Sequence, residues 1–327
     1  MFVEPAVAGG VVYVGSCSGT YFALDAESGE PRWSVDMSPP GGTTTFHSNP
    51  VLVGDLIITS TDGESDGTIY ALEKNSGVVR WARALEEGQV VSDLRQSHGQ
   101  LYALTRAGTL VALDLQDGST RWIVRAARDL HESRGSVLVE DDVVYLGGLD
   151  EHVYAIRPQD GSIVWTRDLG AHVSTSLALR GGSLYAGTGD DRLHRLDAST
   201  GASLATFTLP EDPGGKLLAT ESSIVVLGHE PSSFVAALDP ELQGIVWTAP
   251  ERPWNTIRPV VWRERLILGD TEGSLVGLDV RTGAVVWEDV LRGRLRGLGH
   301  TPETLYVGST AGRLFAYRAV GPGISVE

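Results

Sequence analysis

The sequence predicts an all-β protein, an eight-bladed β-propeller of four-stranded antiparallel blades, and three observations lead to this prediction. A strand–turn–strand stretch recurs along the chain, most clearly at residues 276–287, where Arg281, Thr282 and Gly283 form the turn. Its eight copies, most of them ending on Trp, are spaced by 39 to 48 residues. Two further strand-like runs precede each copy. A nearly fixed period of this length is typical of solenoids, repeat arrays and propellers.

The recurring Trp fixes the register of the repeats. Six copies have it: Trp33, Trp81, Trp122, Trp165, Trp247 and Trp287. A large aromatic side chain buries about 150–250 Å² and fills the gap between twisted blades, so we expect these six to dock between neighbouring blades. The fifth and eighth copies have Ala205 and Val326 instead, and we expect looser blade contacts there.

Each unit reads, in chain order, as four strands that we call A, B, C and D. Strands C and D flank the recurring turn, and Gly- or Asp-containing turns separate most A and B strands. The last strand D, at residues 324–326, is the weakest, because it ends the chain after Gly321, Pro322 and Gly323. Strands A and B are predicted at residues 3–8 and 11–15, 49–53 and 56–59, 90–94 and 101–104, 135–139 and 143–146, 175–179 and 184–186, 216–219 and 224–227, 258–262 and 266–268, and 295–298 and 305–307.

The eight units are expected to share one domain, residues 1–327. A closed ring of four-stranded blades leaves only short strand edges exposed, which favours a propeller over a sandwich. The predicted blades span approximately residues 1–37, 38–86, 87–127, 128–169, 170–210, 211–250, 251–291 and 292–327.

Composition narrows the functional classes. The chain has 42 acidic and 26 basic side chains, a net charge of −16, which opposes nucleic-acid binding because that binding depends on Lys and Arg at phosphates. Cys17 is the only cysteine, so no intrachain disulfide is possible. Because the chain has no long apolar run, we expect no membrane span. We also expect a monomer. We expect a cytoplasmic location for the chain as it stands, and a periplasmic or extracellular one if an export signal was trimmed.

The repeats carry a family resemblance. The pattern from Pro5 to Trp33, with a Val-Tyr-Val-Gly-Ser run, an Ala-Leu-Asp run, a Gly and the Trp, returns at Pro50 to Trp81 and Pro259 to Trp287. It resembles the repeats of the pyrroloquinoline-quinone (PQQ) quinoprotein-like propellers, and weaker copies extend the resemblance over nearly the whole chain. That family includes quinoprotein dehydrogenases, BamB-like lipoproteins of outer-membrane assembly and sensor domains fused to kinases. The resemblance implies the fold and the docking role of the Trp residues.

Within that family, the chain is more similar to the non-catalytic, BamB-like branch. Quinoprotein dehydrogenases typically pair the quinone with calcium and often have a disulfide between adjacent cysteines, which one cysteine cannot form. Their calcium ligands have no residue-by-residue match here. We therefore expect no cofactor, although Trp254 offers a possible platform for PQQ.

Candidate binding residues gather where strand D leads into the next strand A. In a propeller these D-to-A connections surround one mouth of the central channel, so we expect their polar side chains to share a funnel. Such a set is a default binding-site hypothesis, although channel mouths are polar in any case. The candidates are His47, Asn49, Arg95, His131, Arg134, His172, Trp254, Asn255, Arg258 and Arg296.

Two metal sites are weaker alternatives. Histidines from separate D-to-A connections can supply zinc ligands, but they have no fixed spacing. Asp62, Glu64, Asp66 and Glu73 approximate a calcium-binding loop, but the segment joins two strands and reads as an acidic hairpin loop. We expect no metal at either.

The sequence thus predicts a non-catalytic propeller that binds a protein or peptide. This step rests on the family resemblance, since a fold does not specify an activity. The alternative is an enzyme with its site at the channel mouth, either a PQQ-dependent dehydrogenase or a hydrolase or lyase that uses the His and Arg residues there. Quinone absorbance and metal analysis of the purified protein separate the two classes.

Overall fold

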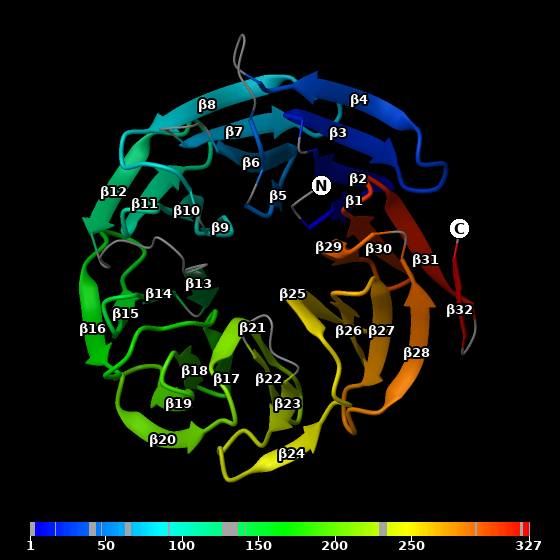
Figure 1. Ribbon diagram of the computed structural model, residues 1–327. Helices are drawn as coiled ribbons and strands as arrows, with labels where there is room; N and C mark the ends of the chain where they lie inside the picture. The colour runs from blue at the N-terminus through cyan, green and yellow to red at the C-terminus, as the bar shows by residue number, and fades with distance from the viewer. Residues whose placement is uncertain are drawn as a thin grey trace.

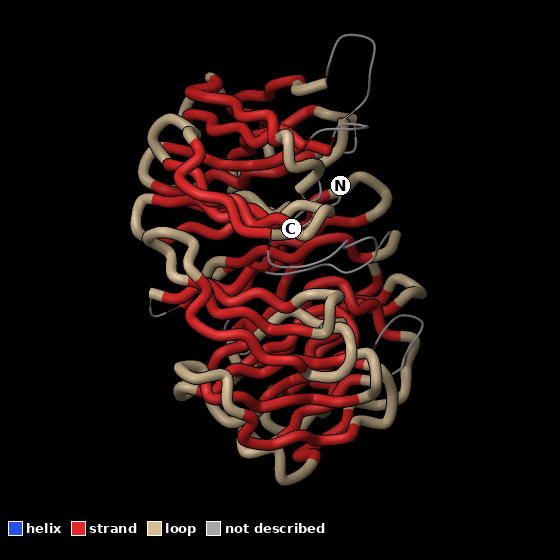
Figure 2. The backbone as a smooth tube through the Cα atoms, turned by 90° about the vertical axis from the view of Figure 1, so that its left-hand side faces the viewer, coloured by secondary structure: helices blue, strands red, loops and turns tan. Residues whose placement is uncertain are grey.

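The protein is an eight-bladed β-propeller, as predicted, with the blades arranged around a central channel (Figure 1). The computed structural model describes residues 4–16, 18–38, 44–46, 48–62, 67–90, 92–125, 137–140, 142–228, 234–291, 293–320 and 323–326. These residues contain strands, turns and loops but no helix (Figure 2). Each blade is a four-stranded antiparallel sheet built from four consecutive strands.

The strands follow the predicted order, with strand A innermost and strand D outermost in each blade (Figure 1). Blades one to four comprise β1 Ala6–Ala8, β2 Val11–Gly15, β3 Thr20–Asp25 and β4 Pro31–Asp36; β5 Val51–Val53, β6 Leu56–Asp62, β7 Gly67–Glu73 and β8 Val79–Leu85; β9 Arg95–Ser97, β10 Gln100–Leu104, β11 Thr109–Asp114 and β12 Thr120–Arg125; and β13 Val137–Glu140, β14 Val143–Gly147, β15 His152–Ile156 and β16 Ile163–Asp168.

The second half of the ring repeats this arrangement. Blades five to eight comprise β17 Ala178–Arg180, β18 Ser183–Thr188, β19 Arg192–Asp197 and β20 Ser203–Thr208; β21 Pro213–Ala219, β22 Ile224–Gly228, β23 Val235–Leu238 and β24 Ile245–Thr248; β25 Trp254–Trp262, β26 Arg265–Asp270, β27 Ser274–Asp279 and β28 Val285–Val290; and β29 Leu295–His300, β30 Thr304–Ser309, β31 Leu314–Val320 and β32 Gly323–Val326.

The inner strands of blades one to five begin two to five residues later than the sequence predicts. In blade three the strand was expected at residues 90–94 but occupies Arg95–Ser97, and in blade five it occupies Ala178–Arg180 rather than 175–179. Upstream of each, one isolated bridge replaces continuous pairing, Val90 with Thr105 and Val173 with Thr188. The apolar residues of these two segments are buried, as their pattern predicts. The pattern does not show at which residue the hydrogen-bonded pairing with strand B begins.

Five of the six register Trp residues join neighbouring blades through two contacts. Each indole N–H donates to a carbonyl of the following blade's C–D turn, at 2.8 Å for Trp33 to Lys74 and 3.0 Å for Trp165 to Ala198. Each ring also packs on the glycine of that turn, so closely that a Cβ at Gly201 would lie 2.6 Å from Trp165 Cε3. Trp81, Trp122 and Trp247 dock in the same way, on Leu115 and Gly118, Pro158 and Gly161, and Val280 and Gly283.

The seventh blade docks differently. Trp287 packs edge-on against Tyr317 of blade eight, with ring centroids 5.3 Å apart. Trp262, outside the repeat register, donates its indole N–H to the Thr301 carbonyl at 2.9 Å. Two Trp residues on different strands of one blade thus contact blade eight.

The junction after blade five is not the loose contact expected from Ala205. The Tyr185 hydroxyl donates to the Pro240 carbonyl at 2.7 Å, so a bond to the next blade's turn is kept without Trp. That turn has the usual length, but its glycine, Gly244, comes one place later, and its Leu242 is buried in the apolar cluster against which Ala205 packs. The tyrosine bond, which Tyr145 makes to Ala198 at the preceding junction as well, and the buried leucine thus hold this junction without an indole.

Blades eight and one close the ring without exchanging a strand, since all four strands of each blade are consecutive. Strand β29 lies against β1, and a Cβ at Gly299 would stand 2.0 Å from the Pro5 carbonyl oxygen. By contrast, the turn glycine of blade one, Gly29, has no described heavy atom within 4 Å of such a Cβ. Among the described residues, ring closure thus relies on the inner strands rather than on a docked aromatic.

The acidic residue eight positions before the Trp organises the C–D turn. Asp25 Oδ1 accepts the N–H groups of Glu27 and Ser28 at 3.0 and 2.9 Å. The Ser28 bond, then the Arg32 guanidinium, hold the pKa of Asp25 well below its usual range. The hydroxyls of Ser199 and Thr200 likewise lower the pKa of Asp197. The eight-residue spacing that defines the repeat therefore separates a carboxylate that forms the turn from a Trp that docks on the next blade.

These lowered pKa values predict acid sensitivity. A carboxylate with a lower pKa in the folded state stabilises the protein above its unfolded pKa of about 3.9, and this stabilisation is lost as pH falls through that value toward the folded pKa. We expect the melting temperature to change little between about pH 7 and 5.5 and to drop below about pH 4. Melting of wild type and Asp197→Ala, followed by circular dichroism, tests this. A variant that keeps the full acid-induced drop of the wild type excludes Asp197 from the effect.

Two turn glycines at the same position of the repeat allow the energetic cost of backbone strain to be measured apart from the cost of displacing a docked Trp. Gly29 and Gly201 have φ values of +74° and +69°, but only Gly201 lies under an indole. Gly29→Ala should cost roughly 1–2 kcal/mol of unfolding free energy from left-handed strain alone. Gly201→Ala should cost roughly 1–3 kcal/mol more, because the methyl group displaces Trp165. Urea unfolding measures both, and equal losses would contradict the docking role of the glycine.

Candidate functional site

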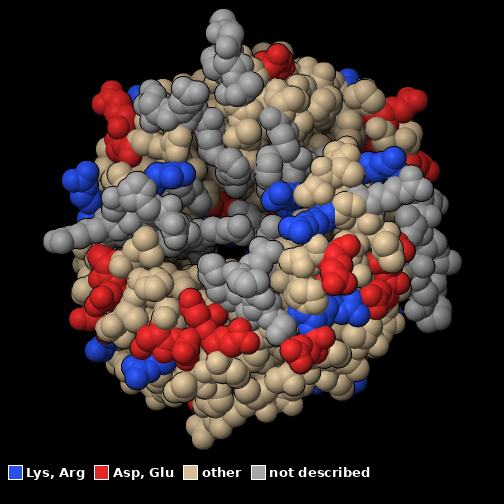
Figure 3. Space-filling view, viewed as in Figure 1, with Lys and Arg blue, Asp and Glu red and all other residues tan. Residues whose placement is uncertain are grey.

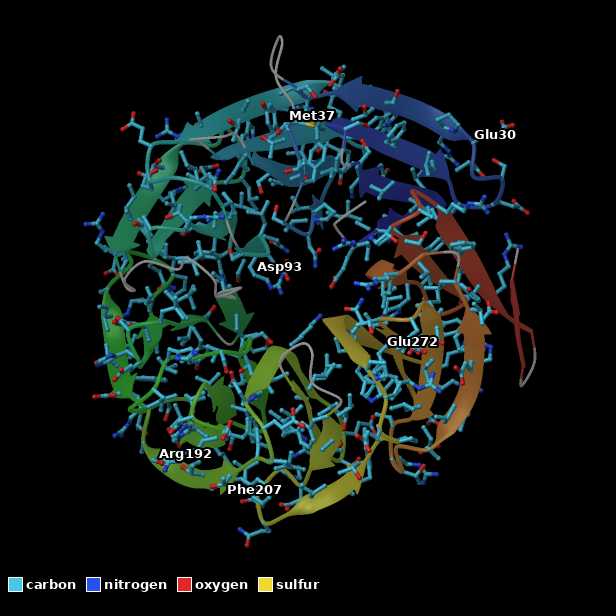
Figure 4. The ribbon with its side chains drawn as sticks, in the orientation of Figure 1. Glu30, Met37, Asp93, Arg192, Phe207 and Glu272 are labelled. Carbon is cyan, nitrogen blue, oxygen red and sulfur yellow. The ribbon has the colours of Figure 1, made fainter. Side chains whose placement is uncertain are left out.

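The D–A connections and B–C turns surround the channel mouth that faces the viewer in Figures 1 and 3. The surface is hollowed at its centre, and acidic and basic side chains are interspersed around this hollow (Figure 3). Asp93 lies at the edge of the channel (Figure 4). This mouth is the place where the sequence predicts a binding site.

Three predicted candidates have described side chains that lie in strand A or in the connection before it. His172 is exposed, with its ring against Gly189, where an added Cβ would lie 2.1 Å from His172 Cε1. Arg95 is partly exposed and pairs with Asp93 at 3.4 Å. Arg296 lies half-buried on β29. They come from blades five, three and eight.

Asn49 and Asn255 serve mainly as links between blades. The Asn49 side-chain oxygen accepts the Glu4 N–H at 3.1 Å, and the Asn49 N–H donates to Asp93 Oδ1 at 3.4 Å. Asn255 is buried and donates its amide to the Leu295 carbonyl at 3.2 Å. Four other candidates contribute no described side chain: His47, His131 and Arg134 lie outside the described residues, and Arg258 has only its backbone described, in β25.

Trp254 does not line the mouth as the sequence suggested. Its side chain is completely buried, in one apolar cluster with Trp247 and Leu266. The Trp254 indole N–H donates to the Pro250 carbonyl at 3.3 Å, and the Arg252 guanidinium lies 5.4 Å from the ring centroid. The sequence placed Trp254 before strand A, whereas β25 begins with it, and the ring packs in the blade interface, where its burial is most favourable. It is therefore not an exposed platform for a quinone or a partner.

Sequence reasoning missed a charged cluster beside Trp254. Arg252 holds Glu288 with two hydrogen bonds of 2.7 and 3.2 Å and reaches the buried Asp270 at 3.3 Å. The hydrogen bond from Arg252 lowers the pKa of Glu288, and the same bond raises the pKa of Arg252. The sequence contained one indication of this cluster. Asp270 is acidic at the position where the first repeat has Ser16, directly after the strand-B glycine.

The acidic loop cannot gather all four of its proposed ligands. Residues 63–66, which include Glu64 and Asp66, lie outside the described part of the chain, as does the side chain of Asp62. Glu73 ends β7, six residues from Gly67, which places it about 20 Å along the strand. There its carboxylate pairs with Arg80 at 3.0 Å and accepts the Ser76 hydroxyl at 2.8 Å. Glu73 therefore stabilises a C–D turn at the opposite end of the blade.

The described residues hold no group of three or more His, Cys, Asp or Glu side chains arranged to bind a metal ion. They also contain no helix that is long and apolar enough to span a membrane. They do contain a cavity of about 340 Å³ in the channel. Its lining comprises Glu4, Pro5, Ala6, Val7, Asn49, Pro50, Lys216, Val260, Leu298, Gly299 and His300, so it shares only Asn49 with the predicted set.

Comparison with known proteins identifies the family. The sequence profile described as outer membrane protein assembly factor BamB matches residues 2–81, 47–171 and 149–316. The chain belongs to this BamB family. The predicted resemblance to the BamB-like branch of PQQ-like propellers is thereby confirmed, and the relatives that follow are bacterial.

Individual BamB relatives are distant in sequence. Outer membrane protein assembly factor BamB of Yersinia pestis is 23% identical over 305 residues, covering 87% of this chain and 75% of the relative. The factor of Moranella endobia is 25% identical over 212 residues, covering 62% of this chain and 53% of the relative. The chain thus matches between about half and three quarters of the length of these relatives.

Solved structures agree on the fold. BamB from Moraxella catarrhalis superposes with a TM-score of 0.81 at 20% identity, covering 97% of this chain and 96% of that one. The C-terminal WD40 domain of Sif2 reaches 0.78 at 9% identity, covering 98% and 95%. Propellers with unrelated repeat signatures share this architecture, so these likenesses establish the fold alone.

The Arg252 cluster yields a stability prediction. Arg252→Met leaves the buried Asp270 without its guanidinium partner and should cost about 1–3 kcal/mol of unfolding free energy. Arg252→Lys should recover only part of this, because an ammonium cannot make the bidentate contact with Glu288. The matched control is Arg32→Met, which breaks an exposed pair with Asp25 and should cost less than about 1 kcal/mol. Equal losses for Arg252→Met and Arg32→Met in urea unfolding would contradict a structural role for the cluster.

Proposed function

We propose that this chain is a non-catalytic, protein-binding propeller that takes part in the assembly of outer membrane proteins. The observation that carries the proposal is the BamB family match, whose segments together cover residues 2–316, that is, seven blades and most of the eighth. The printed names of the relatives describe an assembly factor. In this role the chain needs no cofactor. It binds a polypeptide partner rather than nucleic acid, and it does so as a monomer.

The same names favour one of the two locations that we expected from the sequence. An assembly factor for outer membrane proteins acts in the cell envelope, so we propose the periplasmic location rather than the cytoplasmic one. With a net charge of −16, the chain repels strongly acidic surfaces, which favours a partner whose contact face is neutral or basic.

We place partner binding at the D–A mouth. Arg95 on β9 and His172 in the connection before β17 offer hydrogen-bonding groups for such contacts. Arg and other side chains with planar hydrogen-bonding groups suit such contacts, because little rotamer freedom is lost for each bond formed. Asn49 and Arg296 border the same mouth, and His47, His131, Arg134 and Arg258 belong to the same proposed surface by their place in the chain.

Complementation tests the proposal. A Salmonella typhimurium strain that lacks its own BamB, itself 27% identical to this chain over 271 residues, would express this chain with the relative's export segment. We expect restored levels of heat-modifiable outer membrane proteins. Arg95→Ala combined with His172→Ala should reduce this rescue, whereas Arg281→Ala, on a C–D turn at the other end of the channel, should not.

The outcomes separate the function from its location on the surface. No rescue by an exported, folded wild-type chain would overturn the proposed function. Full rescue by the Arg95 and His172 double variant would leave the function in place and move the binding surface away from this mouth. Circular dichroism of each purified variant confirms folding before the comparison.

A further inference from the structure

The C–D turns of the first three blades pair their carboxylates with an arginine of the same blade. This arginine comes seven residues after the acidic residue and is the second residue of strand D. The three pairs are Arg32 with Asp25 at 2.7 Å, Arg80 with Glu73 at 3.0 Å, and Arg121 with Asp114. In these blades the charge of the turn carboxylate is thus balanced within the chain.

Blades four to seven have an aliphatic residue at the position of this arginine. The four residues are Val164, Leu204, Val246 and Val286, which are 46%, 49%, 55% and 50% exposed. Single exposed aliphatic residues are common on protein surfaces, but here one repeat position is exposed and aliphatic in four consecutive blades. Their strands β16, β20, β24 and β28 follow one another in the outer wall of the ring (Figure 1).

Blades five and seven retain the turn carboxylate without its arginine. In blade five, Asp197 Oδ1 accepts the N–H groups of Ser199 and Thr200 at 3.0 and 2.9 Å. In blade seven, Asp279 Oδ1 accepts the N–H groups of Arg281 and Thr282, each at 3.0 Å. Oδ2 of these two carboxylates accepts no hydrogen bond from any described residue, and both aspartates are partly exposed. In blades one and three the arginine binds this second oxygen.

Blades four and six have the exposed aliphatic residue but no such oxygen. In blade six, Asp239 Oδ2 already accepts the Gly244 N–H at 2.7 Å. In blade four, Arg157 replaces the acidic residue, and its guanidinium donates to the Ser162 hydroxyl at 2.6 Å. Among the described C–D turns, only those of blades five and seven therefore combine an exposed aliphatic residue with an available carboxylate oxygen. The other two blades are internal controls for this combination.

We propose that blades five and seven each bind an arginine side chain of a partner polypeptide. Its guanidinium would bind Oδ2 of Asp197 or Asp279, and its aliphatic stem would pack on Leu204 or Val286. Arg32 shows within this chain that a guanidinium reaches the equivalent oxygen from the outer wall. The partner segment is therefore basic, which the net charge of −16 also favours.

The two arginine positions would act together. Strand β24 lies between β20 and β28, so a segment that reaches both blades passes over blade six (Figure 1). There Ile245 and Val246 are exposed and offer apolar contact. One exposed ion pair contributes little to affinity, but two in the same segment reinforce each other, because the second forms within the complex. This inference rests on the protein-binding role proposed above, but it concerns the C–D end of the outer wall rather than the D–A mouth.

Calorimetry with dodeca-arginine tests the proposal on the full chain. This probe spans up to about 40 Å when extended. Leu204→Arg combined with Val286→Arg supplies both turns with an internal arginine, as in blades one and three, and should weaken binding about tenfold or more. The control, Val164→Arg combined with Val246→Arg, adds the same charge at the same repeat position and should weaken binding much less. Equal losses in the two variants, or no saturable binding by the wild type, would overturn the proposal.

Removal of the carboxylates provides a second comparison. Asp197→Asn combined with Asp279→Asn should weaken dodeca-arginine binding more than Asp25→Asn combined with Asp239→Asn, whose second oxygens are already bonded. The reverse order would contradict the assignment. Sedimentation velocity examines the other occupant, a second copy of the chain. A wild-type dimer that Leu204→Arg with Val286→Arg dissociates would assign the surface to that copy and overturn the proposal. Failure here leaves the complementation test of the proposed function unaffected, because that test varies the D–A mouth.

Discussion

The contact on which the ring depends is a Trp ring packed on a glycine, with its indole N–H bonded to a carbonyl three residues earlier in the same turn. Trp33 with Lys74 and Gly77 shows the arrangement, which recurs for four other blades. A hydrogen bond fixes the direction of the ring, and the missing Cβ allows its close approach. Because the glycine has positive φ and an acidic side chain usually holds the turn, one short stretch specifies both blade geometry and blade docking.

This coupling explains why the fold was readable from the sequence. The interval from turn carboxylate to Trp is local, so it can be counted in the five copies that retain both residues. Where the contact is made by other residues, the pattern misleads: Ala205 suggested a weak junction, yet Tyr185 and Leu242 complete it. Tyr185 belongs to strand B and Leu242 to the next blade, so no single stretch of sequence records their cooperation.

The channel mouth was harder to predict for a related reason. Position along the chain identified residues near strand A, but not the direction of their side chains. Trp254 and Asn255 follow one another on β25, and both are drawn into blade interfaces by burial and hydrogen bonding. Lys216 lines the channel cavity but was not among the predicted residues, because it lies where the pairing of β21 with β22 shifts register between Gly214 and Leu218, and such a shift is defined only by the partner strand. Long-range pairing of this kind has no local signature in one sequence.

The consecutive order of strands within each blade has a consequence for how the chain is made. Every blade is complete once its own forty or so residues have left the ribosome, and it needs only its predecessor as a template for docking. Growth by such neighbour contacts avoids long loop closures until the last blade, when Gly299 must meet Pro5 across the full length of the chain. An open array of docked blades is therefore the expected precursor of the closed ring. The docking of blade eight on blade one is expected to be the slow step of folding.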